Sequence, residues 1–141
     1  MADTFQKRSV TTGLARRMIT AAEEKARQMG VAMNIAVVDE SGVLKAFSRM
    51  DGAALLSVQI AQDKAYTAVG FGMPTHGWFD FIKDDPPLAV GAAPGIDRLV
   101  IFGGGYPITI DGTVVGAIGV SGGHYSQDQE VAEVGLAVIG G

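Results

Sequence analysis

The chain has 141 residues, of which 48% are hydrophobic and 18% charged, and this predicts one folded domain over residues 1–141 and excludes a disordered chain. The formal net charge of −4 is not offset by a basic block, which argues against nucleic acid as a partner. The lack of cysteine excludes disulfides and thiolate chemistry.

The N-terminal segment predicts a cytoplasmic protein that begins with a helix. Its basic residues are followed by no apolar stretch of signal-peptide type, and no apolar run reaches the roughly 20 residues that cross a bilayer. We therefore expect no membrane partner. Apolar residues between 11 and 29 repeat at helical spacing, and Gly30 follows as a C-terminal stop.

A hairpin and two further helices are predicted next. Residues 31–39 and 43–50 are rich in β-branched and apolar residues and flank a Glu-Ser-Gly turn, which is typical of a β-hairpin. A second helix is predicted from 55 to about 69. A short third helix over 76–85 would take Thr75 as its cap and end at a Pro-Pro pair.

The last third of the chain predicts strands and a final helix. Residues 88–97 are rich in Gly, Pro and Ala and are expected to form a loop. Strands are predicted at 98–102, 106–110 and 113–120, the last two joined by an Asp-Gly turn. Ser126 would cap the final helix in a capping box with Gln129. Because both turns join antiparallel strands, we expect an α+β fold.

Several glycine-rich segments together resemble one known family. They are IAVVDESGVLKAFSRMDGA (35–53), IAQDKAYTA (60–68), FGMPT (71–75), FGGGYPI (102–108) and DGTVVGAIGVSGG followed by QDQEVAEVGL (111–136). This order, over nearly the whole chain, is similar to the haem-binding HbpS/GlcG-like family, whose relatives include the C-terminal domain of PduO cobalamin adenosyltransferases. The resemblance implies a profilin-like domain, with a five-stranded antiparallel sheet flanked by helices, that assembles into homo-oligomers.

The same resemblance implies a small-ligand-binding protein that takes haem and is accessory to a catabolic pathway. In PduO-like members a histidine of the first helix ligates the iron, whereas residues 11–30 here contain none. That helix offers only Met18 or Met29 as a ligand. The two imidazoles of the chain are His76 and His124.

His124 follows a strand end and two glycines and comes just before the last helix. Glycines allow a ligand to approach the backbone closely, and unpaired N–H groups at a helix start favour an anion. A carboxylate could therefore bind at the backbones of 103–105 and 121–123 while His124 transfers a proton. The proposed ligand-binding residues are Gly103, Gly104, Gly105, Ser121, Gly122, Gly123, Tyr125 and Arg49. The structural alternative is a turn histidine on the surface.

His76 and Phe79 are the candidates for a flat cofactor. His76 begins the short third helix, and Phe79 belongs with Trp78 and Phe81 to an aromatic cluster that could form one wall of a haem site. The structural alternative places these rings in the core or at a subunit interface.

Lys64 interrupts the apolar stripe of the second helix. It could anchor an acidic ligand or form a Schiff base in a catalytic site. Alternatively its stem packs while its ammonium reaches solvent or a carboxylate such as Asp63 or Asp84. No metal site is predicted, since the spacing of Asp80, Asp84 and Asp85 matches no metal motif.

Three functions follow from these patterns. The first is a binder of haem or another planar tetrapyrrole with His76 or His124 as axial ligand. The second is a small enzyme (a tautomerase, isomerase or enamine/imine hydrolase) acting on an unsaturated carboxylate with His124 as acid/base and Lys64 as a further catalytic residue. The third is an oligomeric scaffold, in which Gly135 permits close helix packing.

Overall fold

Five helices and four strands follow one another in the computed structural model, which describes residues 1–141. The first helix and the two hairpins lie where the sequence predicts them. In chain order the elements are α1 (Thr12–Met29), β1 (Asn34–Asp39), β2 (Leu44–Arg49), α2 (Leu55–Phe71), α3 (His76–Ile82), α4 (Pro86–Gly95), β3 (Gly105–Ile110), β4 (Thr113–Ser121) and α5 (Tyr125–Leu136).

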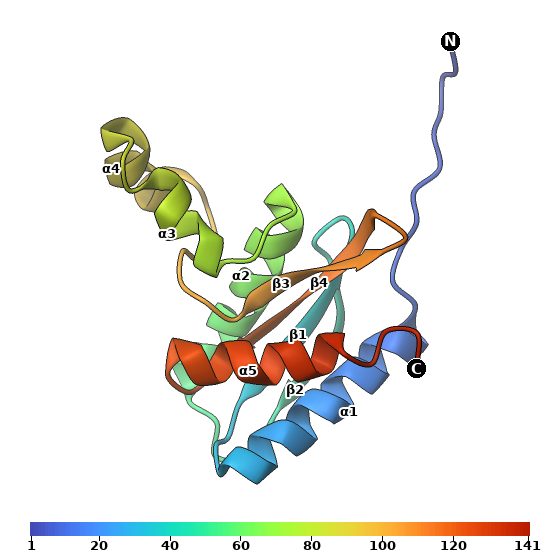
Figure 1. Cartoon of the computed structure of the whole chain (residues 1–141), viewed down its shortest axis with the longest axis vertical. Helices are drawn as coiled ribbons and strands as arrows, with labels where there is room; N and C mark the ends of the chain where they lie inside the picture. Colours follow the sequence, from blue (N-terminus) through green and yellow to red (C-terminus); the bar gives the residue numbers. More distant parts are fainter.

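The four strands form one antiparallel sheet in the order β2-β1-β4-β3 (Figure 1). Each half of the sheet is a hairpin, as expected from the two turns. The central pairing of β1 with β4 is long-range and runs from Asn34↔Ser121 to Asp39↔Gly116. The C-terminal end of β4 therefore lies beside the start of β1.

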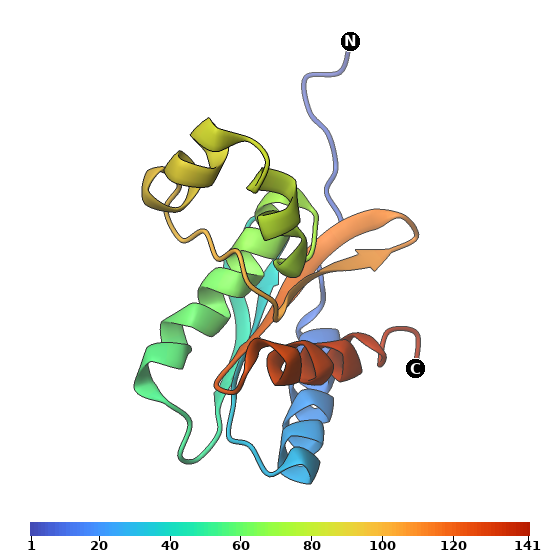
Figure 2. The same ribbon diagram turned by 60° about the vertical axis from the view of Figure 1, so that its left-hand side comes forward.

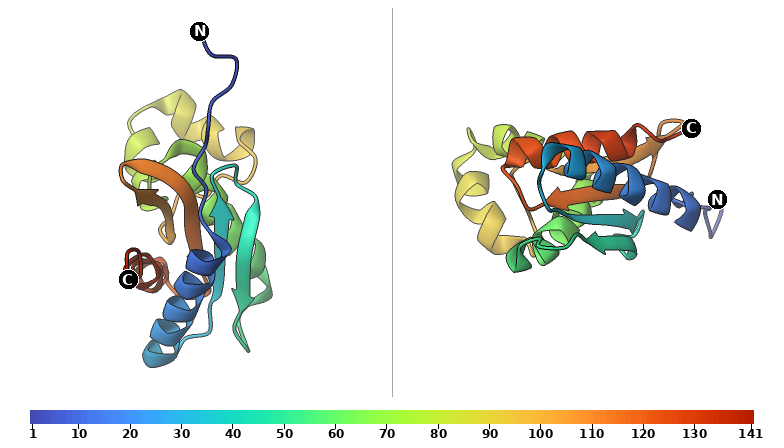
Figure 3. Two further views of the ribbon diagram at one scale, coloured as in Figure 1. Left: turned by 90° about the vertical axis from the view of Figure 1, so that its right-hand side faces the viewer. Right: turned by 90° about the horizontal axis from the view of Figure 1, so that it is seen from below.

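Helices cover both faces of the sheet: α1 and α5 lie on one face and α2 on the other (Figure 3). Alternate residues of the strands point to the two layers. Ile35 and Ile118, for example, belong to the 17-residue core under α1 and α5. Val38 and Ala117 pack instead against Ala65 and Ala68 of α2. The fold is α+β, as predicted.

The cap of the last helix differs from the prediction. His124, not Ser126, is the N-cap of α5, and the capping box pairs it with Gln127 rather than Gln129. The ring Nδ1 of His124 accepts from the backbone N–H of Ser126, and the backbone N–H of His124 donates to Oε1 of Gln127. An imidazole nitrogen can accept a backbone N–H as a serine hydroxyl does, and the cap lies two residues earlier than predicted.

Residues 98–102 do not form the expected fifth strand. Thr67 of α2 forms hydrogen bonds with the backbone of this segment: its Oγ1 donates to the carbonyl of Arg98 and accepts from the N–H of Val100. Arg98 also has a left-handed backbone, with φ 64°, which no continuous strand contains. These contacts hold the segment against α2, and the sheet has four strands rather than five.

Residues 88–97, expected to be a loop, largely form helix α4. Pro86 stands in its first turn, where a missing N–H does no harm, and the carboxylate of Asp85 accepts from the N–H of Leu88. Ala92 packs on Trp78 and Ile82 of α3. Together α3 and α4 project from one end of the domain, as Figure 2 shows. No helix of the chain is both long and apolar enough to cross a bilayer.

Gly119 lets α2 approach β4 closely, which suggests a test of the packing. A Cβ at Gly119 would clash with the carbonyl oxygen of Ala61 and come within 2.6 Å of the backbone nitrogen of Ala65. We expect Gly119→Ala to lower the free energy of unfolding by about 1–3 kcal/mol through overpacking. The control is Gly70→Ala in α2, where a Cβ meets nothing within 4 Å. Urea denaturation that finds both variants as stable as the wild type would contradict this account.

Candidate functional site

A cavity of about 490 Å³ opens between α3, the segment leading into β3, and the start of α5. Its volume and its largely apolar lining are typical of small-molecule sites. The lining residues are His76, Phe79, Asp80, Ile101, Phe102, Gly103 and Tyr125. Residues far apart in the sequence therefore share one site.

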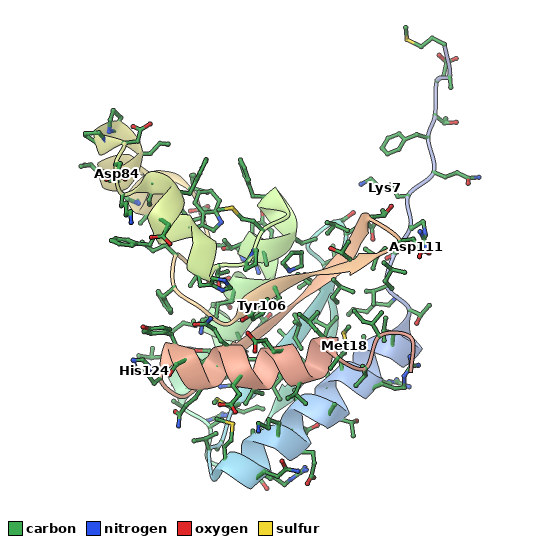
Figure 4. All side chains as sticks on the ribbon, in the orientation of Figure 1. Lys7, Met18, Asp84, Tyr106, Asp111 and His124 are labelled. Atoms are coloured by element: carbon green, nitrogen blue, oxygen red, sulfur yellow. The ribbon has the colours of Figure 1, made fainter.

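His76 provides the imidazole of the cavity and is held from two sides. Its Nδ1 lies 3.5 Å from the amide Nε2 of Gln129 on α5. Its ring meets the ring of Tyr106 edge-on, with 5.5 Å between centroids. Figure 4 shows Tyr106 on β3, between α3 and α5. The imidazole is exposed on its remaining side.

Tyr106 continues the polar contacts behind His76. Its hydroxyl donates to Oε1 of Glu133 at 2.7 Å. Burial, reinforced by this bond to an anion, raises the pKa of Tyr106 to about 12, and a contact with Gln129 opposes the shift. The phenol thus stays protonated and acts as a hydrogen-bond donor at neutral pH.

Behind the cavity lies a buried ion pair between Lys64 of α2 and Asp128 of α5. The Lys64 ammonium has no exposed surface, and its Nζ donates to Asp128 Oδ2 and to the carbonyl of Val120, both at 2.8 Å. The other oxygen of Asp128 accepts from the N–H of Gly123. Burial lowers the pKa of Lys64 and raises the pKa of Asp128, and their mutual attraction offsets part of both shifts.

The triple glycine at 103–105 passes directly over this pair. A Cβ at Gly104 would lie 2.7 Å from the Lys64 ammonium and 2.5 Å from the Val120 carbonyl oxygen. The φ angle of Gly104 is 127°, a backbone conformation that favours glycine. The N–H of Gly105 donates to the hydroxyl of Thr75. Gly104 and Gly105 therefore serve close packing, and Gly103 alone of the three lines the cavity.

The structure brings together four of the residues proposed from sequence: His76, Phe79, Gly103 and Tyr125. His124 lies next to them, at the start of α5 (Figure 4). Its ring lies 4.2 Å from the ring of Tyr125, and its Nδ1 lies 2.7 Å from the Ser126 hydroxyl. His124 is thus a neighbour of the cavity and not part of its lining.

Three of the backbone N–H groups considered for binding a carboxylate have acceptors within the protein. The N–H of Gly123 donates to Asp128, that of Gly105 to Thr75, and that of His124 to Gln127. Gly122 has a φ of 144° and packs against Ala32 and Met33. The α5 terminus therefore supplies its own carboxylate, Asp128, at the place where an external anion was expected.

Three other residues considered from the sequence lie away from the cavity. Arg49 belongs to the edge strand β2, at the opposite edge of the sheet from β3, and donates to the carbonyl of Ala53. Ser121 is buried at the end of β4. Met18 is fully buried in the core under α1, so it does not face the cavity as an alternative iron ligand.

Sequence reasoning missed Phe102, Ile101 and Asp80 in the lining, Asp128 as the partner of Lys64, and Gln129 beside His76. A signal for Asp128 was present, because a lysine on an apolar stripe requires a counter-charge. Its position in the sequence gave no indication, since it lies 64 residues away. No group of three His, Asp or Glu side chains gathers to hold a metal ion.

Comparison with known proteins gives a consistent result. Residues 10–137 match the family of haem-degrading HbpS-like proteins. An uncharacterized 15.0 kDa protein from the dhaT-dhaS intergenic region of Citrobacter freundii is 38% identical over 91% of this chain and 90% of its own length.

Two solved structures resemble the fold over nearly their whole length. The crystal structure of HbpS has a TM-score of 0.89 at 32% identity and covers 99% of this chain and 96% of that one. The crystal structure of the PduOC–haem complex has a TM-score of 0.85 at 31% identity, with 94% and 96% covered.

The buried ion pair can be tested by unpairing it. We expect Lys64→Met to lower the free energy of unfolding by about 3–5 kcal/mol, because Asp128 keeps a buried charge without its partner. Adding Asp128→Leu removes that charge and should recover much of the loss. Urea denaturation of both variants checks this. A single variant that loses under about 1 kcal/mol would contradict the proposed cost of an unpaired carboxylate.

Tyr106 predicts an alkaline loss of stability. Its folded pKa, about 12, exceeds the ordinary value of 10.0, so between these values the unfolded chain releases a proton that the folded protein retains. Stability contributed by Tyr106 is therefore present below about pH 10 and declines as the pH rises toward 12. Urea denaturation at pH 8 and pH 11 should show a smaller decline for Tyr106→Phe than for the wild type. Equal declines would contradict the assignment.

Proposed function

Because the chain belongs to the HbpS-like family, with residues 10–137 matched, we propose that it binds haem in the cavity beside His76. The observation that carries this proposal is the combination of one exposed imidazole with an aromatic and aliphatic lining around about 490 Å³. A flat, largely apolar ligand with a metal centre requires both features.

The residues of the cavity fit haem by their chemistry. His76 would be the axial ligand, as imidazole is in many haem proteins. Phe79, Phe102 and Tyr125 would hold the apolar macrocycle, with Gly103 beside them in the lining. Bound haem would supply an iron centre for redox or ligand-binding chemistry. The chain's own residues bind it, orient it and limit the access of water.

The relatives support haem as the ligand. The iron ligand in this chain would be His76 of α3, whereas the family resemblance implies a histidine of the first helix. PduOC, with a TM-score of 0.85 to this chain, has been crystallised with haem. Helix α1 contains no histidine here, and its Met18 is buried. The iron ligand would therefore come from α3 and not from α1. His124 at the α5 N-cap is the second candidate for the axial position, and Nδ1 of His124 already has a local partner.

The enzyme hypothesis has less support. The N–H groups at 105, 123 and 124 that would hold a carboxylate have intramolecular acceptors. Lys64, which the enzyme hypothesis proposes as a catalytic residue, is fully buried and paired with Asp128. A homo-oligomer and an accessory role in a catabolic pathway stay predictions, with small carboxylates as a second ligand class.

Haem titration tests the proposal directly. The purified wild type should shift the Soret band of added haem and bind it saturably. His76→Ala should lower the affinity at least about tenfold, because the iron loses its protein ligand. His124→Ala is the matched control and should bind as the wild type does.

Two outcomes would overturn the assignment. A wild-type spectrum identical to that of free haem would remove the proposed function. Saturable binding that His76→Ala leaves unchanged and His124→Ala abolishes would move the axial ligand to the α5 N-cap and refute the role of His76.

A further inference from the structure

We propose that Gln129 is the residue that positions His76, fixing the orientation of its imidazole so that Nε2 faces the cavity and setting the tautomer of the ligand-free ring. This inference deepens the proposed haem function and rests on it for its consequence in binding. The contact itself, Gln129 Nε2 to His76 Nδ1 at 3.5 Å, belongs to the ligand-free protein and can be tested there.

Space for the Gln129 amide is provided by a glycine. A Cβ at Gly103 would overlap Oε1 of Gln129 and come within 2.6 Å of its Cδ and 2.8 Å of its Cγ. No other glycine faces this side chain so closely. The absent side chain at 103 therefore opens the position from which Gln129 reaches across to α3.

Helix α5, which carries Gln129, is held in place by contacts of Asp128, the residue before Gln129. Asp128 is bonded to Lys64 on one oxygen and to the N–H of Gly123 on the other. One turn further along α5, Glu133 accepts from the hydroxyl of Tyr106, whose ring lies edge-on to His76. The buried ion pair and the tyrosine thus anchor α5 on both sides of Gln129, with His76 facing it from α3.

The chemistry of a primary amide suits this role. An amide nitrogen only donates, so its contact requires that Nδ1 of His76 be the acceptor and that Nε2 carry the proton in the ligand-free protein. A histidine that binds a metal through Nε2 carries its proton on Nδ1 and donates it to a neighbouring acceptor. Rotating the same amide by 180° presents Oε1 for that purpose. Glutamine can therefore serve both states without a change of shape.

Nitrogen NMR of the ligand-free protein tests the contact first. The chain has only two histidines, so His124→Asn, which keeps a side-chain acceptor at the α5 N-cap, leaves the ring signals of His76 alone. At pH 8 in this background we expect the Nε2–H tautomer to be populated more strongly than in a free histidine, which already prefers it. Adding Gln129→Ala should return the ratio to that of a free histidine, and Gln129→Glu should switch the ring toward Nδ1–H, since a carboxylate only accepts.

Two further variants separate positioning from general damage to α5. Gly103→Ala places a methyl group against the amide and should shift the tautomer ratio as Gln129→Ala does. Glu130→Ala removes the neighbouring side chain, which is paired with Lys25, and should leave the ratio unchanged. A ratio that is insensitive to both Gln129→Ala and Gly103→Ala would overturn the inference.

Haem binding gives the second readout. Gln129→Ala should weaken binding about 10- to 100-fold, the usual cost of removing a partner from a metal-bound histidine. Gln129→Glu, which retains an acceptor for Nδ1–H, should restore most of it. Wild-type binding by Gln129→Ala would refute the positioning role while leaving the haem site intact. If the wild type fails to bind haem, the proposed function fails, and the tautomer experiment still decides whether Gln129 holds His76.

Discussion

The buried ion pair between Lys64 and Asp128 connects the two sides of this protein. Lys64 belongs to α2 and Asp128 to α5, the helices that cover opposite faces of the sheet. The Lys64 ammonium lies 2.8 Å from the Asp128 carboxylate and also donates to the carbonyl of Val120, near the end of β4. Such a pair adds little net stability over well-packed apolar residues, because both charges lose their hydration. We infer that the pair instead fixes how α2 and α5 lie against the sheet, since either charge would be left buried and unpaired without the other.

The surroundings of the candidate site follow from this constraint. Residue 104 can cross the pair only as glycine, because a Cβ at Gly104 would lie 2.7 Å from the ammonium. Asp128 also bonds the N–H of Gly123, which fixes the start of α5. Tyr125 and Gln129 are placed by that first turn, one in the cavity lining and the other beside His76. Gly104 is thus explained by the charge that it covers, and Gly103 by the Gln129 side chain beside it.

Local patterns were sufficient for some elements and misleading for others. The stripe between Thr11 and Gly30 and the two hairpin turns carry their own signals, and the structure confirms them. Residues 98–102 have a strand-like composition, yet their backbone is hydrogen-bonded to the Thr67 side chain and does not join the sheet. The sequence proposed His76 and Phe79 for a flat cofactor and Gly103 and Tyr125 for a second ligand site, without showing that the four residues meet. The sequence also assigned Gln129 to the capping box of the last helix, whereas Gln129 lies beside His76. Spacing alone cannot show which side of a helix faces a neighbouring element.

The sequence by itself determined the α+β class, the two hairpins, the unusual position of Lys64 on an apolar stripe and the similarity to a haem-associated family. These properties depend on residue type and on neighbours within a turn or a hairpin, where geometry follows from periodicity. The tertiary structure decided which carboxylate pairs with Lys64, that the sheet has four strands, and that α3, β3 and α5 converge on His76. Those contacts join residues tens of positions apart, and their energies depend on burial and packing that no local pattern contains.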